Sequence, residues 1–92
     1  MEQLKEGQIM SPRTYKVTAP LTGTFYRAPS PEERPFVEIG QRINAGDVLC
    51  IIESMKVFTE LRADQGGIVK NILVEDEDTV MRNQEIIEIE LG

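Results

Sequence analysis

The residues best suited to chemistry in this chain form the tetrapeptide Glu53-Ser54-Met55-Lys56, which lies between two apolar segments. A lysine can act as a Schiff-base nucleophile, a phosphate ligand or an attachment point. The first role requires desolvation that lowers the lysine pKa, and the second favours a glycine-rich loop. A short turn containing Ser54 and Met55 offers neither. Lys56 is therefore either an attachment point, which needs only exposure and a rigid surround, or an ordinary surface lysine.

The composition argues against several other kinds of site. The 92 residues carry a net charge of −6, whereas nucleic acids and anionic membranes bind surfaces rich in lysine and arginine. Histidine, the commonest general base and metal ligand, is absent. The single cysteine, Cys50, lies in an apolar run and is predicted to be a buried small hydrophobe. We therefore predict no catalytic residue and no metal site. Without an apolar stretch of about 18 residues or a signal peptide, a cytoplasmic location is expected.

The chain repeats itself around the lysine. Ala19 and Gly23 align with Ala63 and Gly67 at one fixed offset. Four apolar positions align at a second offset, seven residues shorter: Val37, Ile43, Leu49 and Ile52 with Val74, Val80, Ile86 and Ile89. Two equivalent β-rich halves are therefore predicted, with Lys56 in the short connection between them.

Short apolar segments alternate with turn residues from Lys16 onward, which predicts an all-β domain. Strands are expected at residues 16–19, 23–27, 48–53, 57–63, 68–74 and 85–91. Two β halves of this size bury a core only against each other, so we expect a flattened β-barrel or sandwich of two quasi-symmetric four-stranded halves. Residues 1–15 are polar and patternless and are expected to be a disordered leader or linker remnant. The domain itself is expected at residues 16–92.

The tetrapeptide closely resembles the E-A/S-M-K motif of biotinyl domains. Upstream, Gly23-Thr24-Phe25-Tyr26-Arg27 and Ala28-Pro29-Ser30-Pro31 resemble the corresponding stretch of the biotin carboxyl carrier family of bacterial and plastid acetyl-CoA carboxylases. The likeness covers about residues 17–91. The Met-Lys pair alone is weak evidence. The same pair at the centre of a duplicated β domain, together with this upstream stretch, is strong evidence for the resemblance to a biotinyl domain.

The resemblance implies a barrel-sandwich hybrid fold and a biotin carried covalently on Lys56 as a swinging arm. A biotin protein ligase would attach it, inspecting Glu53, Ser54, Met55 and Val57. The biotin would shuttle a carboxyl group from a biotin carboxylase subunit to a carboxyltransferase subunit, for malonyl-CoA synthesis from acetyl-CoA in fatty acid biosynthesis. In such a carrier the cofactor performs the chemistry and the protein supplies tethering and orientation. The chain would itself catalyse nothing.

The seven surplus residues of the first half fall within one proline-rich segment. We call residues 28–35 the thumb, and they are Ala28, Pro29, Ser30, Pro31, Glu32, Glu33, Arg34 and Pro35. Three prolines bar this segment from a central strand. From the residues alone it is a tolerated surface loop. The resemblance implies a projection that approaches the biotin, is characteristic of the acetyl-CoA carboxylase carrier and is lacking in most other biotinyl domains.

Two positions depart from the family pattern. Val57 stands where carriers usually have Met, and Ser54 stands where bacterial carriers usually have Ala. Lipoyl domains share the fold and typically read D-K-A or D-K-V. Val57 therefore slightly favours a lipoyl domain, whereas Met55 in place of Asp argues strongly against one. The alternatives are a biotinyl domain of another biotin-dependent carboxylase or decarboxylase, a lipoyl domain, and an unmodified interaction module.

Overall fold

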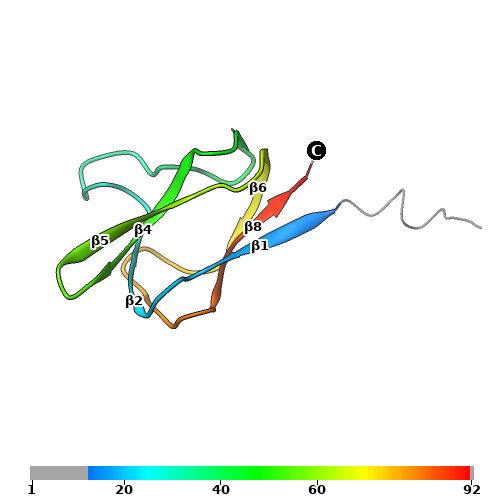
Figure 1. Cartoon of the computed structure of the whole chain (residues 1–92). Coiled ribbons are helices and arrows are strands. Elements are labelled where there is room, and N and C mark those ends of the chain that lie inside the picture. The colour runs from blue at the N-terminus through cyan, green and yellow to red at the C-terminus, as the bar shows by residue number, and fades with distance from the viewer. Residues whose placement is uncertain (1–12, 92) are drawn as a thin grey trace, which may run out of the picture.

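The computed structural model describes residues 13–91, which form eight strands in two four-stranded antiparallel sheets (Figure 1). The strands are β1 (Thr14–Thr18), β2 (Gly23–Tyr26), β3 (Arg42–Ile43), β4 (Val48–Ser54), β5 (Val57–Arg62), β6 (Gly67–Ile72), β7 (Thr79–Val80) and β8 (Glu85–Glu90). The sheets have the orders β1-β8-β6-β3 and β5-β4-β2-β7. This architecture confirms the predicted all-β sandwich. Within the described range, no helix is long and apolar enough to cross a membrane.

Each sheet is built from both sequence halves. The first sheet takes β1 and β3 from the first half and β6 and β8 from the second, and the other sheet has the reciprocal composition. Exchanging each strand for its repeat partner converts one sheet order into the other. The duplication predicted from the sequence is therefore present, but its two halves are interleaved and neither half forms a sheet alone.

Backbone hydrogen bonds follow the same duplication. The Ala19 amide donates to the Gln84 carbonyl oxygen at 2.9 Å, and the equivalent Ala63 amide donates to the Asp47 carbonyl oxygen at 2.8 Å. Each bond joins the end of an outer strand to the turn before a central strand. Both halves thus form the same corner, which indicates that the repeat pattern in the sequence reflects repeated backbone geometry.

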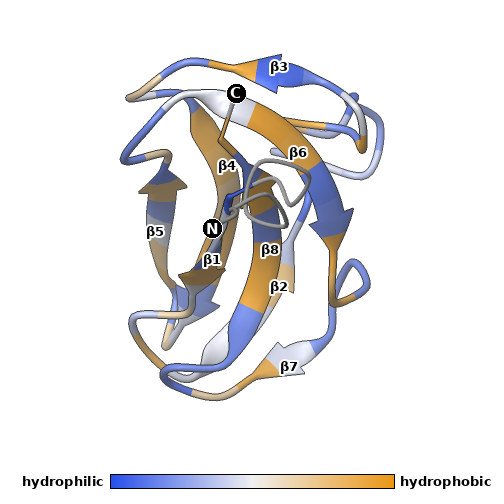
Figure 2. Cartoon of the chain, turned by 90° about the vertical axis from the view of Figure 1, so that its right-hand side faces the viewer, coloured by the Kyte–Doolittle hydropathy of each residue, from blue (hydrophilic) through white to orange (hydrophobic). Residues whose placement is uncertain are grey.

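The core includes most of the apolar positions that reveal the repeat. The buried side chains are Ala19, Phe25, Val37, Ile43, Leu49, Cys50, Ile52, Ala63, Val69, Val80, Ile86, Ile87 and Ile89. Among the aligned apolar pairs, only Val74 is less than fully buried, and it packs against this cluster. No polar side chain of the described residues is buried. Figure 2 shows the apolar residues concentrated on the central strands, as expected for a core that excludes water.

Cys50 is one of the core residues. Its side chain is inaccessible to solvent, and burial raises the pKa of its thiol to about 12. A thiol that stays protonated and enclosed is neither a nucleophile nor a metal ligand at neutral pH. The prediction that Cys50 acts as a small hydrophobe is confirmed.

Most strand ends differ from the sequence predictions by one or two residues, and two differences are larger in consequence. Strand β1 begins at Thr14, two residues before the expected domain boundary, and Tyr15 packs against the core. The rest of the expected leader, residues 1–12, lies outside the described residues. The two-residue strands β3 and β7 were not predicted, because a strand this short has too few side chains to show an alternating pattern.

Two glycines allow the closest backbone contacts in the sheets. A Cβ atom on Gly23 would overlap the Glu53 carbonyl oxygen on β4, and a Cβ atom on Gly67 would overlap the Glu90 carbonyl oxygen on β8. The two positions are repeat partners, so the same steric requirement applies once in each sheet. Glycine is needed here because the neighbouring backbone leaves no space for a side chain.

Gly67→Ala should destabilise the fold by about 1–3 kcal/mol, since β8 must shift to admit the methyl group. Lys70→Ala on the same strand is the matched control. Lys70 is exposed, so its truncation should change the unfolding free energy by no more than about 0.5 kcal/mol. Urea unfolding measures both, and equal stability of the two variants would contradict the steric assignment.

Candidate functional site

Lys56 lies at the tip of the hairpin formed by β4 and β5. Ser54 pairs with Val57 across the hairpin, which leaves Met55 and Lys56 as the two turn residues. In Figure 1 this hairpin projects at one end of the molecule, and β1 begins and β8 ends at the other end. The strands therefore hold the lysine away from the rest of the domain.

The turn has a backbone conformation that its residues do not favour. Met55 has φ = 53° and Lys56 has φ = 67°, so both central residues are left-handed, as in a type I′ turn. Such turns favour Asn-Gly, because a residue with a Cβ atom costs roughly 1–2 kcal/mol in this conformation. A Met-Lys pair at this position opposes local preference, and such strain is commonly found at functional sites.

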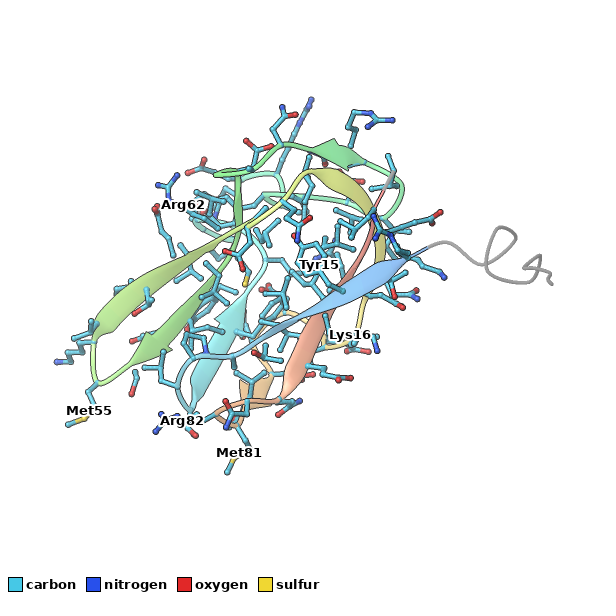
Figure 3. The ribbon with its side chains drawn as sticks, turned by 45° about the vertical axis from the view of Figure 1, so that its right-hand side comes forward. Tyr15, Lys16, Met55, Arg62, Met81 and Arg82 are labelled. Atoms are coloured by element: carbon cyan, nitrogen blue, oxygen red, sulfur yellow. The ribbon has the colours of Figure 1, made fainter. Side chains whose placement is uncertain are left out.

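The side chains around Lys56 are apolar and open to solvent. Met55 is 93% exposed, and Figure 3 shows it pointing away from the body of the domain. Val57 is 62% exposed and Phe58 is 61% exposed. We call Met55, Lys56, Val57 and Phe58 the hairpin tip. Lys56 forms no salt bridge with any residue in the range 13–91, so its amine is accessible within an apolar surround.

Glu53 lies at the base of the hairpin tip and has a partner on the neighbouring strand β2. The Tyr26 hydroxyl donates a hydrogen bond to Glu53 Oε1 at 3.0 Å. This hydrogen bond, together with partial burial, raises the pKa of Tyr26 above its ordinary value. Tyr26 therefore remains a donor throughout the neutral pH range, and the Glu53 carboxylate is held by a fixed contact.

The thumb is a loop outside both sheets, as its prolines predicted. It is closed at its root, where the Phe36 amide donates to the Arg27 carbonyl oxygen at 2.8 Å. Within it, the Glu33 amide donates to the Ser30 carbonyl oxygen at 3.1 Å and forms a turn. Phe36 packs against the core, whereas most of the thumb is exposed. Figure 1 shows the loop at the same end of the molecule as the β4–β5 hairpin.

A cleft elsewhere on the domain does not extend to this site. Its volume is about 260 Å³, and its lining includes Lys16 and Val17 from β1 and Leu61 and Arg62 from β5. Lys16 Nζ lies 3.6 Å from Glu85, and Arg62 pairs with Glu60 at 2.7 Å. Both cationic side chains already face carboxylates, and the remaining charged residue of the lining is Asp64, so the cleft offers no unpaired positive charge to an anionic ligand.

The structure thus brings five of the predicted site residues together in one hairpin: Glu53, Ser54, Met55, Lys56 and Val57. The thumb residues lie on a separate loop. Sequence reasoning did not identify Phe58 as part of the tip. The available signal was that residues 57 and 58 are both apolar and adjacent on one strand, so they face opposite sides of the sheet and at most one of them can point into the core. Sequence reasoning also gave no role to Tyr26, because the contact with Glu53 depends on strand register.

Comparisons with known proteins agree with this description. Residues 15–89 match the family described as biotin-requiring enzymes. The biotin carboxyl carrier protein of acetyl-CoA carboxylase from Haemophilus influenzae is 49% identical over 74 residues, which cover 80% of this chain and 48% of that protein. The protein of the same name from Nostoc sp. is 45% identical over 82 residues, which cover 89% of this chain and 45% of that protein.

This chain therefore spans about half the length of these two relatives. Among solved structures, the urea carboxylase of Kluyveromyces lactis is similar, with a TM-score of 0.70 and 27% sequence identity. That similarity covers 84% of this chain and 6% of the carboxylase.

The strain in the turn can be tested by giving it the residues that the conformation favours. The double substitution Met55→Asn with Lys56→Gly should raise the unfolding free energy by about 1–2 kcal/mol, because Asn and Gly tolerate positive φ. Lys56→Arg keeps the strained geometry and should change stability by less than about 0.5 kcal/mol. Urea unfolding measures both variants. A double variant less stable than the wild type would show that the turn is unstrained.

Proposed function

The chain belongs to the family of biotin-requiring enzymes, and on this premise we propose that Lys56 carries biotin in amide linkage. The observation that carries the proposal is the position of Lys56 in a two-residue turn at the exposed tip of a hairpin. A modifying enzyme can reach the amine there without displacing any strand. The family description names the cofactor class, and the exposed turn supports Lys56 as the attachment point.

The residues at the tip fit such a modification. Amide formation removes the positive charge of Lys56, and this removal breaks no salt bridge within residues 13–91. The surrounding Met55, Val57 and Phe58 present apolar surface rather than a competing charge. Modification should therefore leave the fold unchanged, as a carrier that is loaded after folding requires.

The protein contributes position rather than catalysis. Biotin, when bound, supplies the ureido nitrogen that accepts and releases a carboxyl group. Strand β4 pairs with β5 on one side and β2 on the other, so the lysine backbone extends from a strand held at both edges. A tethered group of this kind reaches effective concentrations of about the mM range at nearby sites.

We infer that the carboxylase served is an acetyl-CoA carboxylase. Two carrier proteins of that enzyme share 49% and 45% identity with this chain, and the thumb is the feature that other biotinyl domains commonly lack. On this proposal the partners are a biotin protein ligase, a biotin carboxylase subunit and a carboxyltransferase subunit. The chain is then a non-catalytic carrier of fatty acid biosynthesis in the cytoplasm.

A second function is supported by one observation. The similarity to urea carboxylase supports a role as the biotinyl domain of another biotin-dependent carboxylase. The lower identity of 27% makes this the weaker candidate. A lipoyl domain is disfavoured by Met55, because an aspartate is typical of lipoyl domains at that position. An unmodified interaction module is also disfavoured, because it gives no reason for placing Met and Lys in a left-handed turn that opposes their preference.

Lys56→Arg should abolish biotinylation. Arginine keeps the positive charge and the turn but cannot form the biotin amide, and Lys5, Lys16 and Lys70 should not substitute for Lys56. Streptavidin capture after co-expression with a biotin protein ligase, together with intact mass, measures the result and separates biotin from lipoate. Labelling that persists in the Arg variant would show that the attachment point lies elsewhere.

Deleting residues 29–35 should reduce carboxyl transfer without unfolding the domain. The deletion leaves two residues between Arg27 and Val37, as the second half has between Asn71 and Val74. Circular dichroism and streptavidin capture should therefore match the wild type. Malonyl-CoA formation with the partner subunits should fall at least about tenfold, because the biotin loses a nearby surface that restricts it.

Two outcomes would contradict the role given to the thumb. An unfolded deletion variant would make the segment structural. A biotinylated variant with full carboxylase activity would make the thumb an ordinary loop, and would remove the main reason to prefer acetyl-CoA carboxylase over other biotin enzymes.

A further inference from the structure

The contact between Tyr26 and Glu53 joins two segments that are distant in sequence and adjacent to the site. Tyr26 is the last residue of β2 and immediately precedes the root of the thumb, while Glu53 precedes Lys56 by three residues. The hydroxyl donates to Glu53 Oε1 at 3.0 Å across a separation of 27 residues. This is the only side-chain hydrogen bond between residues 13–91 that involves Glu53.

Strand register explains why these two side chains meet. Glu53 pairs with Thr24 on β2 and with Phe58 on β5. Tyr26 lies two residues beyond Thr24, so it occupies the diagonal position on the same face of the sheet, which long side chains can reach. Buried residues Phe25 and Ile52 face the opposite side. Glu53, Tyr26 and Phe58 therefore share the outer face beside the hairpin tip.

The contact restricts a charged side chain that has no other anchor in the described structure. A glutamate on an outer face ordinarily samples several rotamers, and fixing one of them before binding reduces the entropy lost on association. The nearby carboxylates of Glu77 and Asp76 further raise the pKa of Tyr26. The hydroxyl therefore stays protonated at neutral pH, and its bond to Glu53 is lost only as the pH rises through this raised pKa.

We propose that Tyr26 is a positioning residue for modification of Lys56: its hydroxyl fixes the Glu53 carboxylate beside the hairpin tip, where a cationic group of the modifying ligase recognises it. The inference rests on the proposed function. Tyr26 does not touch the reacting amine and acts only through Glu53. The predicted loss on removing its hydroxyl is thus in recognition of the domain and not in the chemical step.

Tyr26→Phe in the full 92-residue chain removes the hydroxyl and keeps the ring. The KM of a biotin protein ligase for the unmodified domain should rise by about 3- to 10-fold with kcat nearly unchanged, the pattern for a lost binding contact. Tyr15→Phe is the matched control. The Tyr15 hydroxyl also donates one hydrogen bond, to the Gln65 carbonyl oxygen at 3.0 Å, and it accepts one from the Gln65 amide at 3.4 Å, but it lies on β1 (Figure 3). Its loss should leave KM unchanged.

Coupling to Glu53 separates positioning from a general structural effect. In a Glu53→Ala background, Tyr26→Phe should change KM by less than about twofold, because the group it positions is gone. Equal effects of Tyr26→Phe in the two backgrounds would overturn the inference. A wild-type KM for the Tyr26→Phe variant would overturn it as well, while leaving the biotin assignment of Lys56 intact. Failure of the wild-type chain itself to be labelled would overturn the proposed function and this inference together.

A spectroscopic measurement tests the contact without any ligase. The chain has two tyrosines and no tryptophan, so Tyr26 is the only tyrosine left in Tyr15→Phe. Its ionisation, followed by tyrosinate absorbance, should have a pKa above the ordinary value of about 10. Adding Glu53→Ala should lower that pKa, because the carboxylate acceptor is removed. An unchanged titration would show that the hydroxyl is not bound to Glu53 in solution and would overturn the inference.

Discussion

The pairing of β4 with β5 is the constraint on which the site depends. These strands belong to different halves of the duplicated sequence, yet they lie side by side in one sheet with Ser54 opposite Val57. Antiparallel pairing at this register leaves only two residues for the connection, and the type I′ turn that they form requires positive φ at both. The exposure and the backbone conformation of Lys56 both follow from where the two halves meet.

The quasi-symmetry also determines what lies at the opposite end. The repeat partners of β4 and β5 are β8 and β1, and they form the same antiparallel pair in the other sheet. There the equivalent position holds no turn. Instead the Leu91 amide donates to the Arg13 carbonyl oxygen at 2.7 Å, where the described chain enters and leaves the fold. The duplication therefore places the lysine and the points where the described chain enters and leaves the sheets at opposite ends of the sandwich, an arrangement that suits the proposed carrier role.

Much of this fold could be predicted from the sequence, because apolar residues repeated at fixed offsets report which positions are buried. Ile52 and Ile89 are an example, and the same pattern located Lys56 between the halves. The exchange of strands between sheets was not predictable in this way, because an apolar pattern specifies the buried face of a strand and not its neighbour. The Tyr26–Glu53 contact was missed for the same reason, since it exists only when β2 and β4 pair in one particular register.

The strained turn is tolerated because the sheets compensate for it. Left-handed Met55 and Lys56 oppose folding by roughly 1–2 kcal/mol each, but the hairpin behind them contributes Leu49, Cys50 and Ile52 to the apolar core. Burial of one such large aliphatic side chain stabilises the fold by about 1.5–3 kcal/mol. Selection for stability alone would favour Asn-Gly at the tip. The Met-Lys pair found there supports the proposal that the turn serves to present the Lys56 amine beside Met55, while the remainder of the domain supplies the stability that such a turn lacks.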